Sequence, residues 1–166
     1  MTNISPPPAR IYLLRHAKAA RAAAGQRDFD RPLDDDGYAA AEIVAEKAAD
    51  KDYIPDLVIS STALRCRQTA EAMRRATGPD TEFRFVDELY NATKAIYLEI
   101  LSSQGTRDSV MLVGHNPTIG QTLEALIGHD AFTSTLPKGF PKGGLAVVDA
   151  SAAAKTGWTL KEFLIE

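Results

Sequence analysis

The sequence has little cysteine and no long apolar run, and both shortages exclude classes of protein. Cys66 is the single cysteine among 166 residues, which excludes an intramolecular disulfide and a cysteine-based zinc cluster. No stretch approaches the apolar length that crosses a bilayer. The first residues, MTNISPPPAR, lack the apolar core of a secretory signal, so we expect a cytoplasmic location.

The sequence also has fewer basic than acidic residues. The 19 Lys and Arg residues are outnumbered by 22 Asp and Glu residues, and the formal net charge is −3. An acidic chain has no general field that attracts nucleic acid or an anionic membrane, so we expect neither as a partner. A few arginines can still form a local site for one phosphate group.

The length fits one compact domain that buries its own core. We expect a single domain over residues 1–166, with an extended lead-in at residues 1–9, where three prolines follow one another. Strands are predicted at 11–15, 57–60, 82–86, 109–113, 145–148 and 158–164. Helices are predicted at 37–50, 62–77, 93–101 and 117–127, the second capped by Ser61 or Thr62, and a looser stretch follows. This alternation predicts a three-layer α/β/α fold with a mainly parallel sheet.

Residues suited to phosphate chemistry follow the predicted strands. Arg15 and His16 end the first strand, Arg65 begins the helix after the second, and His115 follows the strand at 109–113. Open α/β sheets bind ligands at the carboxyl ends of their strands, so we expect these side chains to meet. Arginine binds phosphate oxygens bidentately, and a neutral imidazole can attack phosphorus. The pattern therefore predicts phosphoryl transfer.

Other candidates have simpler interpretations. Arg67 lies two positions from Arg65, so it points to another side of the helix and is expected to be exposed. His129 follows a predicted helix end, where it would act as a cap or dipole partner. The acidic run 34–36 is expected to complement a helix dipole rather than bind a metal, and we predict neither a metal nor a cofactor. Cys66 is expected to be a small helix residue, since no catalytic base is paired with it.

Three motifs resemble those of one known family. LLRHAK at residues 13–18, ALRCRQTA at 63–70 and VGHNP at 113–117 resemble the signature segments of the histidine phosphatase superfamily, which has a phosphoglycerate mutase-like fold. The short chain and RPLDDDG at 31–37 resemble the SixA-like phosphohistidine phosphatases. The likeness covers roughly residues 10–150. Each motif alone is weak, whereas three in the right order are specific.

The resemblance implies a role for each matching residue. His16 would be the nucleophile that becomes phosphorylated, without a metal. Arg15 and Arg65 would clamp the phosphate, and His115 would stabilise the transition state. Glu88, in VDELYNA, occupies the place of the acid that is common in the family.

The chain also departs from the family pattern. The signature glycine is Ala17 here, and alanine enters positive φ less readily, although SixA-like sequences often carry Arg-His-Ala-Lys. We expect Lys18 to add positive charge at the rim of the pocket and Arg31 to contact the substrate.

Three functions remain open. The leading hypothesis is a phosphohistidine phosphatase that acts on a phosphorylated protein, since a chain without an inserted cap should have a shallow, open pocket. The second is a phosphatase of small phosphomonoesters or a mutase-like enzyme, for which Glu88 would be essential. The third is a phosphate-recognition module without catalysis, against which the two histidines argue, because a binder needs no nucleophile.

Overall fold

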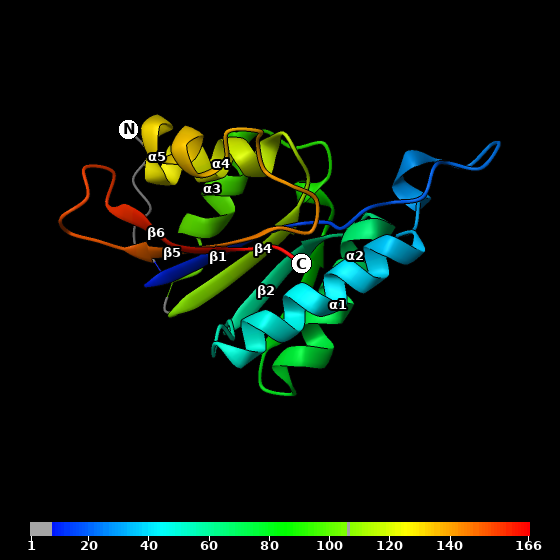
Figure 1. The fold of residues 1–166 in the computed structure, drawn as a ribbon, viewed down its shortest axis with the longest axis horizontal. Coiled ribbons are helices and arrows are strands. Elements are labelled where there is room, and N and C mark those ends of the chain that lie inside the picture. Colours follow the sequence, from blue (N-terminus) through cyan, green and yellow to red (C-terminus); the bar gives the residue numbers. More distant parts are fainter. Residues whose placement is uncertain (1–7, 106) are drawn as a thin grey trace.

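The computed structural model describes residues 8–105 and 107–166 and has a central sheet of six strands (Figure 1). The strands are β1 (Arg10–Arg15), β2 (Leu57–Ser61), β3 (Glu82–Val86), β4 (Ser109–Gly114), β5 (Leu145–Ala150) and β6 (Trp158–Leu164). The six predicted strands are confirmed, with ends that differ by at most about two residues. Most of the expected lead-in, residues 1–7, lies outside the described residues, and the single-domain boundaries stay a prediction.

The strands lie in the order β3-β2-β4-β1-β5-β6. The first four run parallel, as predicted, whereas β5 pairs antiparallel with both β1 and β6. Every residue of β2 is buried, as are the four inner residues of β1, because helices cover both faces of the sheet. The antiparallel edge is a hairpin, which needs no helix to connect its strands.

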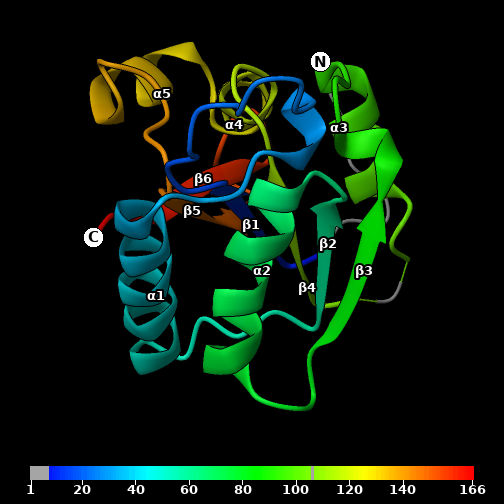
Figure 2. The same cartoon turned by 90° about the vertical axis from the view of Figure 1, so that its right-hand side faces the viewer.

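Helices form a layer on each side of the sheet (Figures 1 and 2). On one face lie α1 (Asp35–Asp50) and α2 (Leu64–Thr77), and on the other lie α3 (Lys94–Ser102), α4 (Thr118–Ile127) and α5 (His129–Thr135). Each layer packs on its own cluster of buried apolar side chains. The predicted three-layer α/β/α architecture is therefore confirmed.

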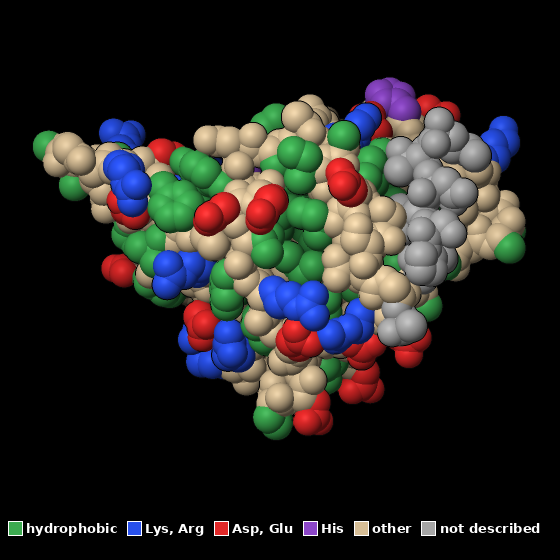
Figure 3. Space-filling view, turned by 180° about the vertical axis from the view of Figure 1, so that it is seen from behind, with side chains coloured by type: hydrophobic (Ala, Val, Ile, Leu, Met, Phe, Trp, Pro, Cys, Tyr) green, Lys and Arg blue, Asp and Glu red, His purple; other side chains and the backbone are tan. Residues whose placement is uncertain are grey.

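No helix in the described part of the chain has the length and apolarity to span a bilayer. On the described part of the face seen in Figure 3, acidic and basic side chains are interspersed, so that face presents no broad field of one sign.

The start of α1 is tied to the loop that follows β1. The side chain of Asp34 accepts the backbone N–H of Gly37 at 2.8 Å, which caps the helix. A Cβ atom on Gly37 would lie 2.1 Å from the carbonyl oxygen of Lys18, so only glycine permits this close approach. The segment RPLDDDG thus fixes where the loop after β1 returns to the fold.

Two local predictions were wrong. Helix α2 begins at Leu64 with Ala63 as its N-cap, so neither candidate cap residue holds that position. The hydroxyl of Thr62 instead donates to Asp87 at 2.5 Å, and that of Ser61 accepts the N–H of Ala63. Helix α5 was not predicted, since HDAFTST is short and polar and carries no helical period.

Candidate active site

A cavity of about 330 Å³ lies at the edge of the sheet where β1, β2 and β4 end. Its volume is at the lower end of the range for small-molecule sites. The parallel register places Arg15 opposite Gly114, so the residues that follow β1 and β4 leave the sheet side by side. The cavity is lined by His16, Arg65, Leu89, Asn91, Ala92, Tyr97, His115, Asn116, Pro117 and Thr118.

His16 is held in one orientation and one tautomer. Its backbone N–H donates to the carbonyl of Gly114, and its side-chain Nδ1 lies 2.7 Å from the carbonyl oxygen of Ala17. A carbonyl oxygen only accepts, so Nδ1 carries the proton and Nε2 keeps its lone pair. Burial lowers the pKa of His16 to about 3, so the ring stays neutral at physiological pH. The result is an imidazole with a free nucleophilic nitrogen.

His115 lies beside His16, with 5.4 Å between their ring centroids. Its Nε2 is 2.8 Å from the hydroxyl oxygen of Ser61. Burial, together with the charge of Arg65, lowers the pKa of His115 to about 4. Two neutral imidazoles therefore share the cavity, and a bound dianion would favour protonation of either one.

Arg65 extends from the first turn of α2 into the site and is only 7% exposed. Its Nη2 lies 3.5 Å from Nδ1 of His115. The prediction that Arg67 points elsewhere is confirmed, because Arg67 is exposed. A short strand-to-helix turn therefore places one guanidinium beside the two imidazoles.

Arg15 adds a second guanidinium next to the site. Its Nη1 donates to the carbonyl of Phe140 at 2.7 Å, while its buried Nε has no hydrogen-bond partner among the residues that the structure describes. Burial lowers the pKa of Arg15 from its ordinary value. An acceptor for this buried N–H would relieve the cost of leaving it unpaired.

Four predicted site residues, Arg15, Glu88, Lys18 and Arg31, do not line the cavity. Glu88 is exposed on a short 3₁₀ helix, Asp87–Leu89. Lys18 lies 3.4 Å from the carboxylate of Asp34, at the start of α1. Arg31 donates to the carbonyl of Ala20 and to Asp28, both at 2.9 Å. The structure thus gathers His16, Arg65 and His115 around the cavity and leaves the other four predicted residues, Arg15 among them, outside its lining.

The motif glycine replaced by Ala17 does not require left-handed backbone here. The φ angle of Ala17 is not positive, and its side chain is buried. Its N–H donates to the hydroxyl of Thr69 on α2 at 3.1 Å. The alanine therefore fits without backbone strain.

Cys66 is fully buried beside the second histidine. Its sulfur lies 3.4 Å from Nε2 of His115, and burial raises the pKa of the thiol to about 12. The thiol is therefore neutral, as expected of a small helix residue. In residues 8–105 and 107–166, no group of three His, Cys, Asp or Glu side chains is placed to hold a metal ion.

Residues at or next to the cavity that sequence reasoning missed include Asp28, Tyr90 and Tyr97. The ring of Tyr90 packs edge-on against His115, with 5.4 Å between centroids. Asp28 stands in a polar run with four other aspartates, so its type carried no signal. Tyr97 belongs to an apolar helical stretch and resembled an ordinary core residue.

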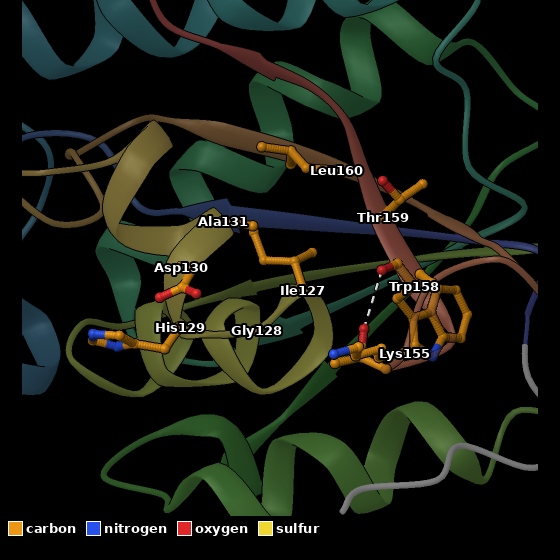
Figure 4. Close-up of a pocket in the computed structure, with 11 residues that line it drawn as sticks. Ile127, Gly128, His129, Asp130, Ala131, Lys155, Trp158, Thr159 and Leu160 are labelled. Carbon is orange, nitrogen blue, oxygen red and sulfur yellow. Dashed lines mark hydrogen bonds between the residues drawn. The ribbon is translucent and has the colours of Figure 1, made fainter.

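His129 lies apart from His16 and His115. It was expected to be a cap or dipole partner past a helix end. It follows Gly128, the C-cap of α4, and is the first residue of α5, and its Nδ1 lies 2.6 Å from the carboxylate of Glu124. It borders a separate hollow of about 430 Å³ between α5 and the start of β6. Figure 4 shows the ring of His129 directed away from Trp158, which lies on the other side of this hollow.

The sequence model of the histidine phosphatase superfamily (branch 1) matches residues 11–93, the half of the chain that contains His16 and Arg65. The chain belongs to the histidine phosphatase superfamily. The resemblance inferred from the three motifs is therefore confirmed, and the fold is phosphoglycerate mutase-like.

Solved structures of this superfamily resemble the chain over nearly its whole length. One, from Agrobacterium tumefaciens, carries the name phosphohistidine phosphatase SixA; it is 54% identical with a TM-score of 0.89, over 95% of this chain and 97% of that chain. A SixA structure from Nakamurella multipartitia is 30% identical with a TM-score of 0.76, over 95% and 97% of the two chains. An uncharacterized protein of Mycobacterium tuberculosis is 33% identical over 140 residues, 81% of this chain and 85% of that protein.

Proposed function

We propose that this histidine phosphatase removes phosphate from phosphohistidine, using His16 as its nucleophile and without a metal ion. The observation that carries the proposal is the tautomer of His16. Its Nδ1 proton is fixed on the carbonyl of Ala17, which leaves Nε2 unprotonated in a cavity shared with His115 and Arg65. A neutral, oriented imidazole beside a guanidinium suits attack on a phosphoryl group.

The reaction proceeds in two displacements. In the first, a bond forms between Nε2 of His16 and phosphorus while the bond from phosphorus to the leaving nitrogen breaks, and that nitrogen takes up a proton. Arg65, Arg15 and His115 stabilise the charge on the phosphoryl oxygens, and the buried Nε of Arg15 gains an acceptor. In the second, water attacks phosphorus, the bond from phosphorus to Nε2 breaks and returns its electron pair to Nε2, and inorganic phosphate leaves while one proton of the water passes to solvent, which supplied the proton of the first step.

The composition of the cavity supports a nitrogen leaving group. As far as the structure describes it, the lining offers imidazole, guanidinium, amide and hydroxyl groups but no carboxyl group. An alkoxide needs a strong acid to leave, whereas an imidazole takes up its proton with little help. The SixA name of the 54% identical relative supports the same substrate class.

Several parts of this proposal stay predictions from the sequence. They are substrate contacts by Lys18 and Arg31, a phosphorylated protein as the partner, and a cytoplasmic location. The acid role of Glu88 also stays a prediction, and it belongs to the alternative with a phosphoester substrate.

The deciding experiment traps and locates the phosphoenzyme. The protein is mixed rapidly, in EDTA, with a radiolabelled phosphohistidine peptide, and separately with an aryl phosphate. We expect an acid-labile label on His16, turnover of the peptide, and loss of both in His16→Ala. The matched control is His129→Ala, which removes an exposed histidine of the other hollow and should leave turnover unchanged.

The other outcomes separate the alternatives. Hydrolysis of the aryl phosphate without hydrolysis of phosphohistidine would favour a phosphatase of small phosphomonoesters. Binding of phosphate without turnover would indicate a recognition module. A label on another residue would refute the role of His16.

A further inference from the structure

Asp28 forms hydrogen bonds with three side chains around the site, those of Arg65, Tyr90 and Arg31. Its main-chain oxygen accepts from Nη1 of Arg65 at 2.8 Å, and its Oδ2 accepts from Nη2 of the same guanidinium at 2.9 Å. Oδ2 also accepts the hydroxyl proton of Tyr90 at 2.7 Å, and Oδ1 accepts from Nη1 of Arg31 at 2.9 Å. One residue thus connects α2, the loop after β1 and the segment after β3.

The two partners differ in exposure, which shows on which side of Arg65 the carboxylate lies. The side chain of Arg65 is 8% exposed and lines the cavity, whereas that of Asp28 is 51% exposed and does not. Asp28 therefore holds the outer part of the guanidinium. The loop that carries it passes over the beginning of α2 (Figure 2).

The N–H groups of Arg65 that do not bond to Asp28 are available to a ligand in the cavity. A guanidinium has five N–H groups, and Asp28 takes two of them. Nη2 is also 3.5 Å from Nδ1 of His115. A guanidinium held along one side cannot rotate about its stem, so its other N–H groups keep a constant direction.

We propose that Asp28 is a positioning residue of the phosphatase, which holds Arg65 from behind so that its free N–H groups face the phosphoryl site. This role rests on the proposed function. Arg31 and Tyr90 hold Asp28 in turn. The hydrogen bond from Tyr90, followed by those from Arg31 and Arg65, keeps the pKa of the Asp28 carboxyl below its usual range.

A competing role for Asp28 predicts the opposite change in phosphate affinity when its charge is removed. A carboxylate next to Arg65 could act as an internal anion that phosphate must displace. Removal of its charge would then tighten phosphate binding, whereas loss of a positioning residue weakens it.

The test compares Asp28→Asn with the wild-type protein. Asparagine keeps the size and the main-chain oxygen but removes the charge. We expect about a tenfold rise in the inhibition constant of inorganic phosphate and about a tenfold lower kcat, the effect of one lost charge-assisted hydrogen bond. The thermal midpoint should stay near wild type. The matched control is Asp30→Asn, because Asp28 and Asp30 lie on one short 3₁₀ helix, Asp28–Asp30, and Asp30 pairs with exposed Arg27 at 2.8 Å.

Two further variants separate positioning from a general structural effect. Tyr90→Phe removes the hydroxyl that holds Asp28 but keeps the ring on His115, and it should shift phosphate inhibition in the same direction by a smaller factor. In an Arg65→Lys background, Asp28→Asn should add little further loss, because the residue acts through the guanidinium.

Each result decides the question. The role of Asp28 would be overturned by unchanged or tighter phosphate binding in Asp28→Asn, or by losses that are fully additive with those of Arg65→Lys. The proposed function would still stand in that case, provided that the wild-type protein hydrolyses phosphohistidine. A wild-type protein that neither hydrolyses phosphohistidine nor responds to phosphate would overturn both.

Discussion

The hydroxyl oxygen of Tyr97 accepts the backbone N–H of His115 at 3.0 Å. The same hydroxyl donates its proton to the carbonyl of Leu89, also at 3.0 Å. Tyr97 is fully buried on α3, and burial raises the pKa of its phenol, so the hydroxyl stays protonated. One phenol therefore ties α3 to the second histidine and to the segment that follows β3.

Replacement of this phenol should affect both stability and turnover. Tyr97→Phe leaves the carbonyl of Leu89 and the N–H of His115 without partners, which should lower the free energy of unfolding by about 1–3 kcal/mol. Urea denaturation measures that loss, and kcat should also fall because His115 is less well placed. The control is Tyr53→Phe. It removes a hydrogen bond from a tyrosine hydroxyl to Glu162, and neither residue lines the cavity, so kcat should stay at the wild-type value. Equal kcat in both variants would contradict the positioning of His115 by Tyr97.

Gly114 is required by the same phenol. A Cβ atom at this position would lie 2.4 Å from the hydroxyl oxygen of Tyr97, well inside contact distance. We expect Gly114→Ala to lower the free energy of unfolding by about 1–3 kcal/mol through overpacking. Part of this loss should be recovered when Gly114→Ala is made in the Tyr97→Phe background, because the nearest atom is gone. Full additivity of the two changes in urea denaturation would contradict the clash.

The buried histidines should make the protein sensitive to mild acid. The pKa values of His16 and His115 are lowered to about 3 and about 4, whereas an unfolded histidine titrates near 6.5. Between about pH 6.5 and pH 4 the unfolded chain binds more protons than the folded one, so stability is present above that window and is lost as pH falls through it. Each ring contributes a slope on the order of 1 kcal/mol per pH unit.

Variants test the source of this slope. Denaturant unfolding from pH 7 to pH 4 should show a shallower decline in His16→Asn and in His115→Asn than in the wild-type protein. His129→Asn should retain the decline, since the exposed His129 has a raised pKa from its bond to Glu124 and acts with the opposite sign. A wild-type slope in both buried-site variants would rule out these rings as the cause.

Glu88 separates the two classes of substrate. If the leaving group is an imidazole, Glu88→Gln should leave hydrolysis of phosphohistidine within about twofold of wild type, because no strong acid is needed. Loss of a general acid for a phosphoester would instead lower kcat by about a hundredfold or more. Steady-state rates on both substrates measure the difference. A comparable substitution of exposed Glu99 on α3 serves as the control.

The sequence determined the order of the six strands and of helices α1 to α4, and it predicted Arg15, His16, Arg65 and His115 as the residues of phosphate chemistry. Buried parallel strands consist of successive apolar residues, and side chains that follow them must emerge at one edge of the sheet. That rule was enough to expect His16, Arg65 and His115 together, and the cavity is lined by all three. Helix α5 was not predicted, because its seven residues depend on packing against α4 and have no helical pattern of their own.

Only the tertiary structure decided how those residues are held. The tautomer of His16 depends on where the carbonyl of Ala17 points, which no residue type reveals. The orientation of Arg65 depends on Asp28, 37 positions earlier, and that of His115 on Tyr97, 18 positions earlier. Local sequence fixes which groups reach the site, because strand and helix periods are local. Contacts between distant segments fix their protonation and direction, because hydrogen bonds form only where the folded chain brings donor and acceptor together.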